Sequence, residues 1–313
     1  MKVSLGWVLW FCALVPAFAA APAARTQAPG YYRMQLGDFE VTALNDGVVP
    51  FPATRVLTGV TPEEVKADLA RVYLADPVET SFNAFLINTG DRLVLIDTGN
   101  GNLRGPITGH LSENLRAAGY QPAQIDDIYI THMHGDHVGG LLSGSERAFV
   151  SATVHAAKSE ADYWLSQTNM AAAPREAKVS FQHAMDALGP YIAAGKFSTF
   201  EGNAVLMPGV RALAAYGHTP GHTVYVVESG GQRLMAWGDL VHIGAVQFHD
   251  PEATVIADVD PKAAAAQRKS VLQAAAAGGY WVAGAHLSFP GVGHVRAEEG
   301  HYLWLPVNYT IPH

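Results

Sequence analysis

The apolar positions along the chain follow two patterns, short β-branched runs and longer helical stretches. Short apolar runs bounded by glycine, proline or small polar residues are typical of strands. We interpret as strands the residues 39–44, 82–88, 92–97, 125–130, 149–155, 211–216, 223–228, 233–237, 281–285 and 302–307. Helical patterns cover residues 61–73, 112–118, 158–166, 175–188 and 261–276. Two successive sets of strands and helices predict an α/β fold in which helices cover the outer faces of two packed sheets.

Several element boundaries also carry local signals. Thr61 before Pro62, and Asp260 before the alanine-rich helix, are typical helix N-caps. Gly230-Gly231 is a hairpin signal, and so is the turn at 89–91. Residues 25–37 predict a loose N-terminal lead. Residues 168–200 contain the helix at 175–188 but no strand signal, so we expect an insertion that overhangs the site.

The first 24 residues are typical of a signal peptide. Lys2 provides the positive start, residues 5–14 form an apolar core, and Ala17-Phe18-Ala19 offers small residues for cleavage. The apolar run is short and is interrupted by Pro16, so an uncleaved anchor is the less favoured interpretation. We therefore expect a periplasmic or secreted protein, with residues 25–313 forming a single domain.

Composition narrows the chemistry of the mature chain. Cys12, inside the leader, is the single cysteine of the 313 residues, so cleavage would leave neither disulfides nor thiolate ligands. Loss of Lys2 with the leader would change the formal net charge from −8 to −9. Such an acidic chain disfavours nucleic acid as a partner, and we expect no membrane contact after cleavage.

One stretch concentrates ligand-type side chains, Thr131-His-Met-His-Gly-Asp-His-Val-Gly-Gly140. His132, His134, Asp136 and His137 follow the predicted strand at 125–130 directly. A strand end holds these residues rigidly, and the glycine turn lets them converge. Imidazole and carboxylate are the ligands preferred by borderline metals such as zinc. The stretch therefore predicts a metal site.

Three further candidates also lie just past apolar runs: His218 in a turn between strands, Asp239 after Trp237-Gly238, and His286 after a core strand. Alone, each would more often be structural, but their equivalent positions favour ligation. Asp97 ends another strand. It either caps a turn or orients a ligand histidine, and we favour the second role.

With these residues in place, the chain resembles the metallo-β-lactamase-fold hydrolases. That family's H-x-H-x-D-H motif is present as residues 132–137, followed by the matching His218, Asp239 and His286. The resemblance implies an αββα sandwich with two metal ions. His132, His134 and His218 would hold one ion, Asp136, His137 and His286 the other, and Asp239 would bridge them. Zinc is the expected metal, although manganese, cobalt and iron accept the same ligands.

Within that family, the runs at 217–223, 237–242, 245–248, 258–261 and 284–290 resemble the methyl parathion hydrolase-like and lactonase branch. The resemblance implies a hydrolase of lactones, esters or phosphotriesters, acting on a small molecule, and suggests a homodimer. The bridging aspartate and the lack of a mature cysteine disfavour β-lactam hydrolysis. A non-hydrolytic redox or metal-binding protein is a further alternative, although no flavin-binding partner domain is evident.

The expected mechanism is attack by a metal-bridging hydroxide, formed because two ions lower the pKa of water toward about 7. Asp136 and Asp239 are the assigned catalytic residues, and Asp136 would also steer a proton to the leaving group. Tyr163, Trp164, Phe181 and His242 are candidate pocket residues. Ordinary helix packing explains the three aromatic residues equally well. His222 is expected to serve in a turn or in packing, and the histidines without neighbouring ligands, such as His183, are expected to be structural or exposed.

Overall fold

The computed structural model describes residues 2–3, 21 and 23–311. The predicted signal peptide at residues 1–24, with its cleavage motif and Cys12, lies almost wholly outside these described residues. Among the described helices, none combines the length and the apolar character needed to cross a membrane.

The first large sheet is built from the N-terminal half of the chain and has the strand order β1-β2-β4-β5-β6-β9-β10. Its antiparallel part gives way to parallel pairing from β5 onward. The strands are β1 (Tyr31–Leu36), β2 (Phe39–Phe51), β4 (Val78–Asn88), β5 (Leu93–Ile96), β6 (Asp127–Tyr129), β9 (Thr153–Ala157) and β10 (Phe197–Phe200).

The second large sheet has the order β11-β12-β13-β14-β16-β17-β18, in which β14 and β16 are the parallel neighbours. Its strands are β11 (Ala204–Met207), β12 (Val210–Ala214), β13 (Thr223–Ser229), β14 (Gln232–Ala236), β16 (Trp281–Ala283), β17 (Val292–Ala297) and β18 (Tyr302–Pro306). Two small ribbons pair β3 (Leu57–Thr58) with β15 (Thr254–Val255), and β7 (Leu142–Ser143) with β8 (Glu146–Arg147).

Three apolar layers hold the sheets and helices together. In β4, Phe85 faces the core between the two sheets while Leu86 faces the helices, because successive strand side chains point to opposite faces. In β13, Tyr225 likewise faces the central core and Val226 faces the outer core against α9. The layers are therefore helix, sheet, sheet and helix, which confirms the predicted αββα sandwich.

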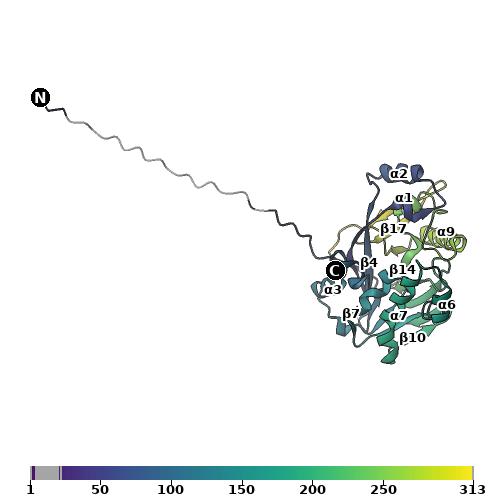
Figure 1. The fold of residues 1–313 in the computed structure, drawn as a ribbon. Coiled ribbons are helices and arrows are strands. Elements are labelled where there is room, and N and C mark those ends of the chain that lie inside the picture. The colour runs from purple at the N-terminus through teal and green to yellow at the C-terminus, as the bar shows by residue number, and fades with distance from the viewer. Residues whose placement is uncertain (1, 4–20, 22, 312–313) are drawn as a thin grey trace.

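The helices lie on the outer faces and at the ends of the sheets. Figure 1 shows α9 beside the strands of the C-terminal half, and α2 at the opposite end of the molecule from α6 and α7. The longer helices are α2 (Pro62–Arg71), α3 (Leu111–Ala117), α5 (Lys158–Trp164), α6 (Gln167–Ala172), α7 (Lys178–Ala193) and α9 (Pro261–Gly278). Short turns of helix are α1 (Ala53–Val56), α4 (Gly135–Val138), α8 (Gly244–Gln247), η1 (Gly101–Ile107), η2 (Pro122–Gln124), η3 (Gly139–Leu141) and η4 (Gly238–Leu240).

Both predicted helix caps are confirmed. The Thr61 side chain accepts the Glu64 N–H while Glu64 reaches back to the Thr61 N–H, and Asp260 accepts the Ala263 N–H at 3.0 Å. The predicted loose lead was wrong, because Tyr31–Leu36 forms the edge strand β1 with alternate residues buried. The absence of a strand in 168–200 was also wrong, because Phe197–Phe200 pairs in parallel with β9. That strand has four residues, too few for periodicity to reveal.

The topology brings the ends of four strands to one edge of the sandwich. β5 and β6 are parallel neighbours in the first sheet, as β14 and β16 are in the second. At this edge the Tyr225 hydroxyl donates to the Ile130 carbonyl at 2.7 Å, and the Thr223 N–H donates to the Thr131 carbonyl at 2.9 Å. The loops that follow these strands therefore meet between the two sheets.

Candidate metal centre

The first cluster of ligand-type atoms joins the loop after β6 to the turn between β12 and β13. His134 Nδ1 lies 3.0 Å from His132 Nε2 and 3.1 Å from His218 Nε2. Asp239 Oδ2 lies 3.6 Å from His132 Nε2 and 3.4 Å from His218 Nε2. One atom from each of the four residues thus falls within 4.8 Å of every other.

The second cluster shares Asp239 and adds residues from α4 and from the loop after β16. Asp239 Oδ1 lies 3.0 Å from His137 Nε2 and 3.1 Å from His286 Nε2. Asp136 Oδ2 lies 3.4 Å from His286 Nε2 and 3.8 Å from His137 Nε2. The structure therefore brings all seven predicted ligand residues into two adjacent groups, with one carboxylate oxygen of Asp239 in each.

These distances suit divalent metal ions. Four ligands about 2.1 Å from zinc stand about 3.4 Å from one another at the corners of a tetrahedron, close to the separations seen here. His137 Nε2 and Asp239 Oδ1 are buried without a hydrogen-bond partner, although buried polar atoms are ordinarily paired. A donor set of histidines and carboxylates with such atoms left open indicates a divalent metal site.

Glycine allows the ligand loop to pack tightly on its neighbour. A Cβ on Gly140 would lie 1.9 Å from the Thr98 carbonyl oxygen, so a side chain there would displace the backbone. The contact is reinforced by the Thr98 N–H, which donates to the His137 carbonyl at 2.9 Å. The two glycines that end the sequence motif therefore let α4 and η3 pack against the loop that follows Asp97.

Asp97 orients a histidine of the second cluster. Its Oδ2 accepts the His137 Nδ1–H at 2.8 Å and the Thr131 hydroxyl at 2.7 Å, and its Oδ1 accepts the Thr131 N–H at 2.8 Å. Because the proton of the neutral imidazole is then on Nδ1, the lone pair of His137 Nε2 faces the cluster, as a metal ligand requires. Of the two roles considered from the sequence, the contacts are those of the orienting carboxylate.

Two further orienting contacts were not found by sequence reasoning. His218 Nδ1 donates to Asp258 Oδ1 at 2.7 Å, with Asp258 40 residues away along the chain. His222 accepts the Asp239 N–H on Nε2 at 3.0 Å and donates from Nδ1 to the Ala215 carbonyl at 3.2 Å. His222 therefore holds the backbone of the shared aspartate, a contact more specific than the turn or packing role expected of it.

Burial and neighbouring charge set the protonation of the cluster. Burial lowers the pKa of His134 to about 3, reinforced by the adjacent His218, which favours the neutral ligand form. Burial opposes the charged form of His218, but Asp239 and Asp258 outweigh it and raise its pKa to about 9. Burial alone would raise the pKa of Asp239, yet His137 and His286 hold it well below its usual range. Asp239 is therefore an anion at neutral pH.

A pocket of about 500 Å³ opens onto the two clusters. Of the four candidate pocket residues, His242 lines it, with Nε2 3.1 Å from Asp239 Oδ2. Trp164 and Phe181 are instead 3% and 1% exposed in the helix–sheet core, and Tyr163 packs against them. Amphipathic helices bury their aromatic residues against the sheet, so the packing interpretation holds for all three.

The pocket wall is largely apolar and includes residues that the sequence did not single out. The apolar part comes from the end of β2, from α1, η1 and β15 with the residues that follow it, and from the start of α7; it includes Val49, Phe51, Pro52, Val56, Leu103, Val179, Val255 and Ile256. Polar groups outside the metal centre come from Asn100, Arg104, Ser180 and His183. His183, expected to be structural or exposed, thus lines the site, and α7 contributes to the pocket through its first turns.

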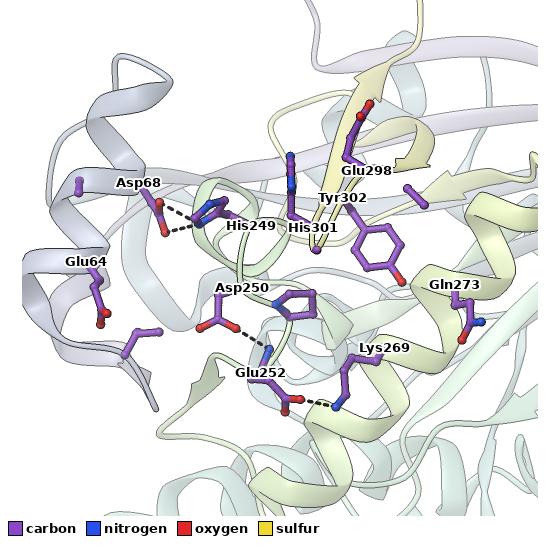
Figure 2. A pocket seen from close by; sticks show the side chains of 15 residues that line it. Glu64, Asp68, His249, Asp250, Glu252, Lys269, Gln273, Glu298, His301 and Tyr302 are labelled. Atoms are coloured by element: carbon purple, nitrogen blue, oxygen red, sulfur yellow. Dashed lines mark hydrogen bonds and ion pairs between the residues drawn. The ribbon is translucent and has the colours of Figure 1, made fainter.

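A wider cleft of about 760 Å³ lies between α2, α9 and the β17–β18 hairpin. Figure 2 shows His249 paired with Asp68, and Lys269 paired with Glu252 across the cleft. Asp250 accepts the Glu252 N–H at 3.0 Å. These charged groups are satisfied by one another, so the cleft lacks the open, converging ligand atoms of the metal centre.

Comparisons with known proteins agree with this geometry. A family model described as the metallo-beta-lactamase superfamily matches residues 80–286. The solved structure of hydrolase AbOPH, described as in the beta lactamase superfamily, is 35% identical, with a TM-score of 0.88 over 91% of this chain and 100% of that one. AidC, a dizinc quorum-quenching lactonase solved with the product N-hexanoyl-L-homoserine, is 27% identical, with a TM-score of 0.83 over 90% and 99%.

Sequence relatives cover less of the chain. An N-acyl homoserine lactonase from a Bacillus species is 24% identical over 164 residues, 46% of this chain and 57% of that protein. A beta-lactamase-like protein 2 homolog from Drosophila melanogaster is 43% identical over 61 residues, 20% of each chain. The family match nevertheless spans well over half of the chain. By fold, ligand cluster and family match, the chain belongs to the metallo-beta-lactamase superfamily.

Proposed function

We propose that this protein is a dinuclear-metal hydrolase that opens lactone rings. The observation that carries the proposal is the pair of ligand clusters sharing Asp239 at the floor of a pocket with a largely apolar wall. The likeness to AidC over nine-tenths of the chain supports a lactone as substrate and zinc as the metal. Simple esters and phosphotriesters are the alternative substrates, because the same chemistry serves all three.

The residues of the metal centre have distinct roles in the proposed hydrolysis. Two divalent ions, when bound, lower the pKa of water and polarise the substrate oxygen. His132, His134 and His218 would hold one ion, Asp136, His137 and His286 the other, and Asp239 would contact both. The side chain of Asp136 is 17% exposed against 3% for Asp239, so Asp136 is the more accessible of the two carboxylates that line the pocket. Asp136 would therefore carry the proton to the leaving oxygen.

The pocket wall supports a substrate with an apolar tail. Ile256 is 67% exposed and Val179 is 54% exposed, yet both line the pocket that leads to the metal ligands. Exposed apolar side chains around a polar floor favour binding of a ligand that is apolar at one end and polar at the other. An acyl chain attached to a lactone ring has this character.

We also propose that the protein is exported across the inner membrane. The support is the positively charged start, the apolar core and the small residues Ala17-Phe18-Ala19 near the N-terminus. Expression of the full chain followed by N-terminal sequencing of the periplasmic fraction tests this. A mature protein that begins near residue 25 is expected, and a full-length chain in the cytoplasm would contradict the proposal.

Hydrolysis by the zinc-loaded protein, purified from residue 25 onward, tests the proposed activity. The substrates are an acyl-homoserine lactone, an aryl ester, a phosphotriester and a β-lactam. Chelator-sensitive turnover led by the lactone is expected, together with loss of at least about 100-fold in Asp239→Asn. Exposed His110, outside both clusters, provides the control variant His110→Ala. Turnover led by the phosphotriester would move the assignment to that class, and full activity of Asp239→Asn would refute the mechanism.

A further inference from the structure

Glu160 is a fully buried carboxylate that the proposed chemistry does not use. It lies in the first turn of α5 and is 0% exposed. Its Oε1 accepts the Met133 N–H at 2.8 Å. Its Oε2 accepts the Thr219 hydroxyl and the Gly221 N–H, both at 2.7 Å. Buried carboxylates are costly unless their oxygens are satisfied, so this one needs its three donors.

The three donors come from two loops, the one that follows β6 and the one between β12 and β13. Met133 stands between His132 and His134, and Thr219 follows His218 directly. One carboxylate thus ties together the two loops that supply all three histidines of that cluster. The second loop also packs closely on α5, because a Cβ on Gly221 would lie 2.3 Å from the Glu160 backbone nitrogen.

The second cluster is held in a different way. Asp97 contacts Thr131 and His137, whereas Glu160 contacts neither residue. In the described part of the chain, no lysine or arginine lies within ion-pair distance of Glu160, and the donors that its carboxylate binds all belong to the ligand loops. Asp97 reaches the first cluster only through the Thr131 hydroxyl, which lies 3.2 Å from His132 Nδ1, whereas Glu160 binds both ligand loops of that cluster directly.

We propose that Glu160 is a positioning residue that keeps His132, His134 and His218 in register for the first metal ion, so that its loss weakens that ion's binding selectively. The inference rests on the proposed metal-dependent function. Its physical basis is that three ligands on two loops bind an ion tightly only if the loops are fixed beforehand.

Glu160→Gln is the sharpest perturbation because it keeps the shape and removes one acceptor. A glutamine amide has one oxygen, so its nitrogen must face either the Met133 N–H or the Gly221 N–H. Either orientation sets two donors against each other and frees one loop from the other. Removal of a hydrogen bond that positions metal ligands typically lowers metal affinity by about 10- to 100-fold.

The test is a cobalt(II) titration of the metal-free protein followed by visible absorption, with thermal melting of the same samples. His134→Ala and His286→Ala identify the spectra of the first and second sites. Glu160→Gln is expected to lower first-site affinity at least about tenfold and to leave the second within about threefold. Asp127→Asn removes another buried carboxylate, one paired with Arg92 and His155, and is the control for general destabilisation.

Equal weakening of both sites in Glu160→Gln, or unchanged affinities with a lower melting temperature, would overturn the proposal. Should Glu160→Gln fail to fold, Thr219→Val removes one donor and keeps the carboxylate. A smaller loss confined to the first site is then expected, and no loss would count against the role of Glu160. Failure of the unchanged protein to bind cobalt at all would refute the proposed function itself, and this inference with it.

Discussion

Asp97→Asn provides the most discriminating test of how the second metal site is built. The Asp97 backbone has a φ of +61°, in the left-handed region that asparagine tolerates well, so the change keeps the local conformation. It also keeps the side-chain shape. What it alters is Oδ2, which accepts both the His137 Nδ1–H and the Thr131 hydroxyl.

The magnitude follows from the hydrogen bonds. An asparagine oxygen can retain the Thr131 N–H, but its NH₂ group then faces the His137 Nδ1–H, donor against donor. His137 escapes this by moving its proton to Nε2, the atom that faces Asp239 and the cluster. A hydrogen bond to a charged group contributes about 1.5–3 kcal/mol. Loss of that amount corresponds to a fall of about 10- to 100-fold in affinity for the second ion.

Competition between the protein and a chelator of known zinc affinity measures both dissociation constants. The expected result is a weaker second site, an unchanged first site and a small change in melting temperature. Asp97→Asn and Glu160→Gln should thus weaken opposite sites, which makes each the control for the other. Equal affinities for wild type and Asp97→Asn at both sites would refute the tautomer argument, and so would an equal loss at both.

Three further predictions concern stability and substrate binding. Burial alone would raise the pKa of Asp127, but His155 and Arg92 hold it below 3.8; its stabilisation is therefore present above about pH 4 and disappears as pH falls through the folded-state pKa. Asp127→Asn should lower the free energy of unfolding by about 1 kcal/mol at pH 5 and by progressively less as the pH falls through the folded-state pKa, as denaturant melts at a series of pH values would show. Phe181→Ala should lower it by about 3–5 kcal/mol with KM unchanged, and a raised KM without destabilisation would return Phe181 to the pocket. Ile256→Ala should have the opposite pattern. It should raise KM for a long-chain acyl lactone by the equivalent of about 1 kcal/mol of binding free energy, while calorimetry finds an unaltered melting temperature.

Local features of the chain were predictable because their causes are consecutive residues. The caps at Thr61 and Asp260 depend on neighbours three residues away. The predicted strand at 125–130 and the ligand residues that follow it, up to 137, are consecutive in sequence. The structure places these predicted ligands in two clusters. The edge strand Tyr31–Leu36 was missed although both its alternation and its two-residue turn into the next strand, which begins at Phe39, are local signals.

Only the tertiary structure determined the contacts between segments far apart in sequence. Asp258 meets His218 across 40 residues, and Glu160 meets Gly221 across 61, and no spacing in the sequence marks either pair. The same holds for Phe181, since a buried helix face has one periodicity whether it borders a core or a pocket. Residue types and local spacing could thus name the metal ligands, whereas the partners that orient them depend on which loops the two sheets bring to the same edge.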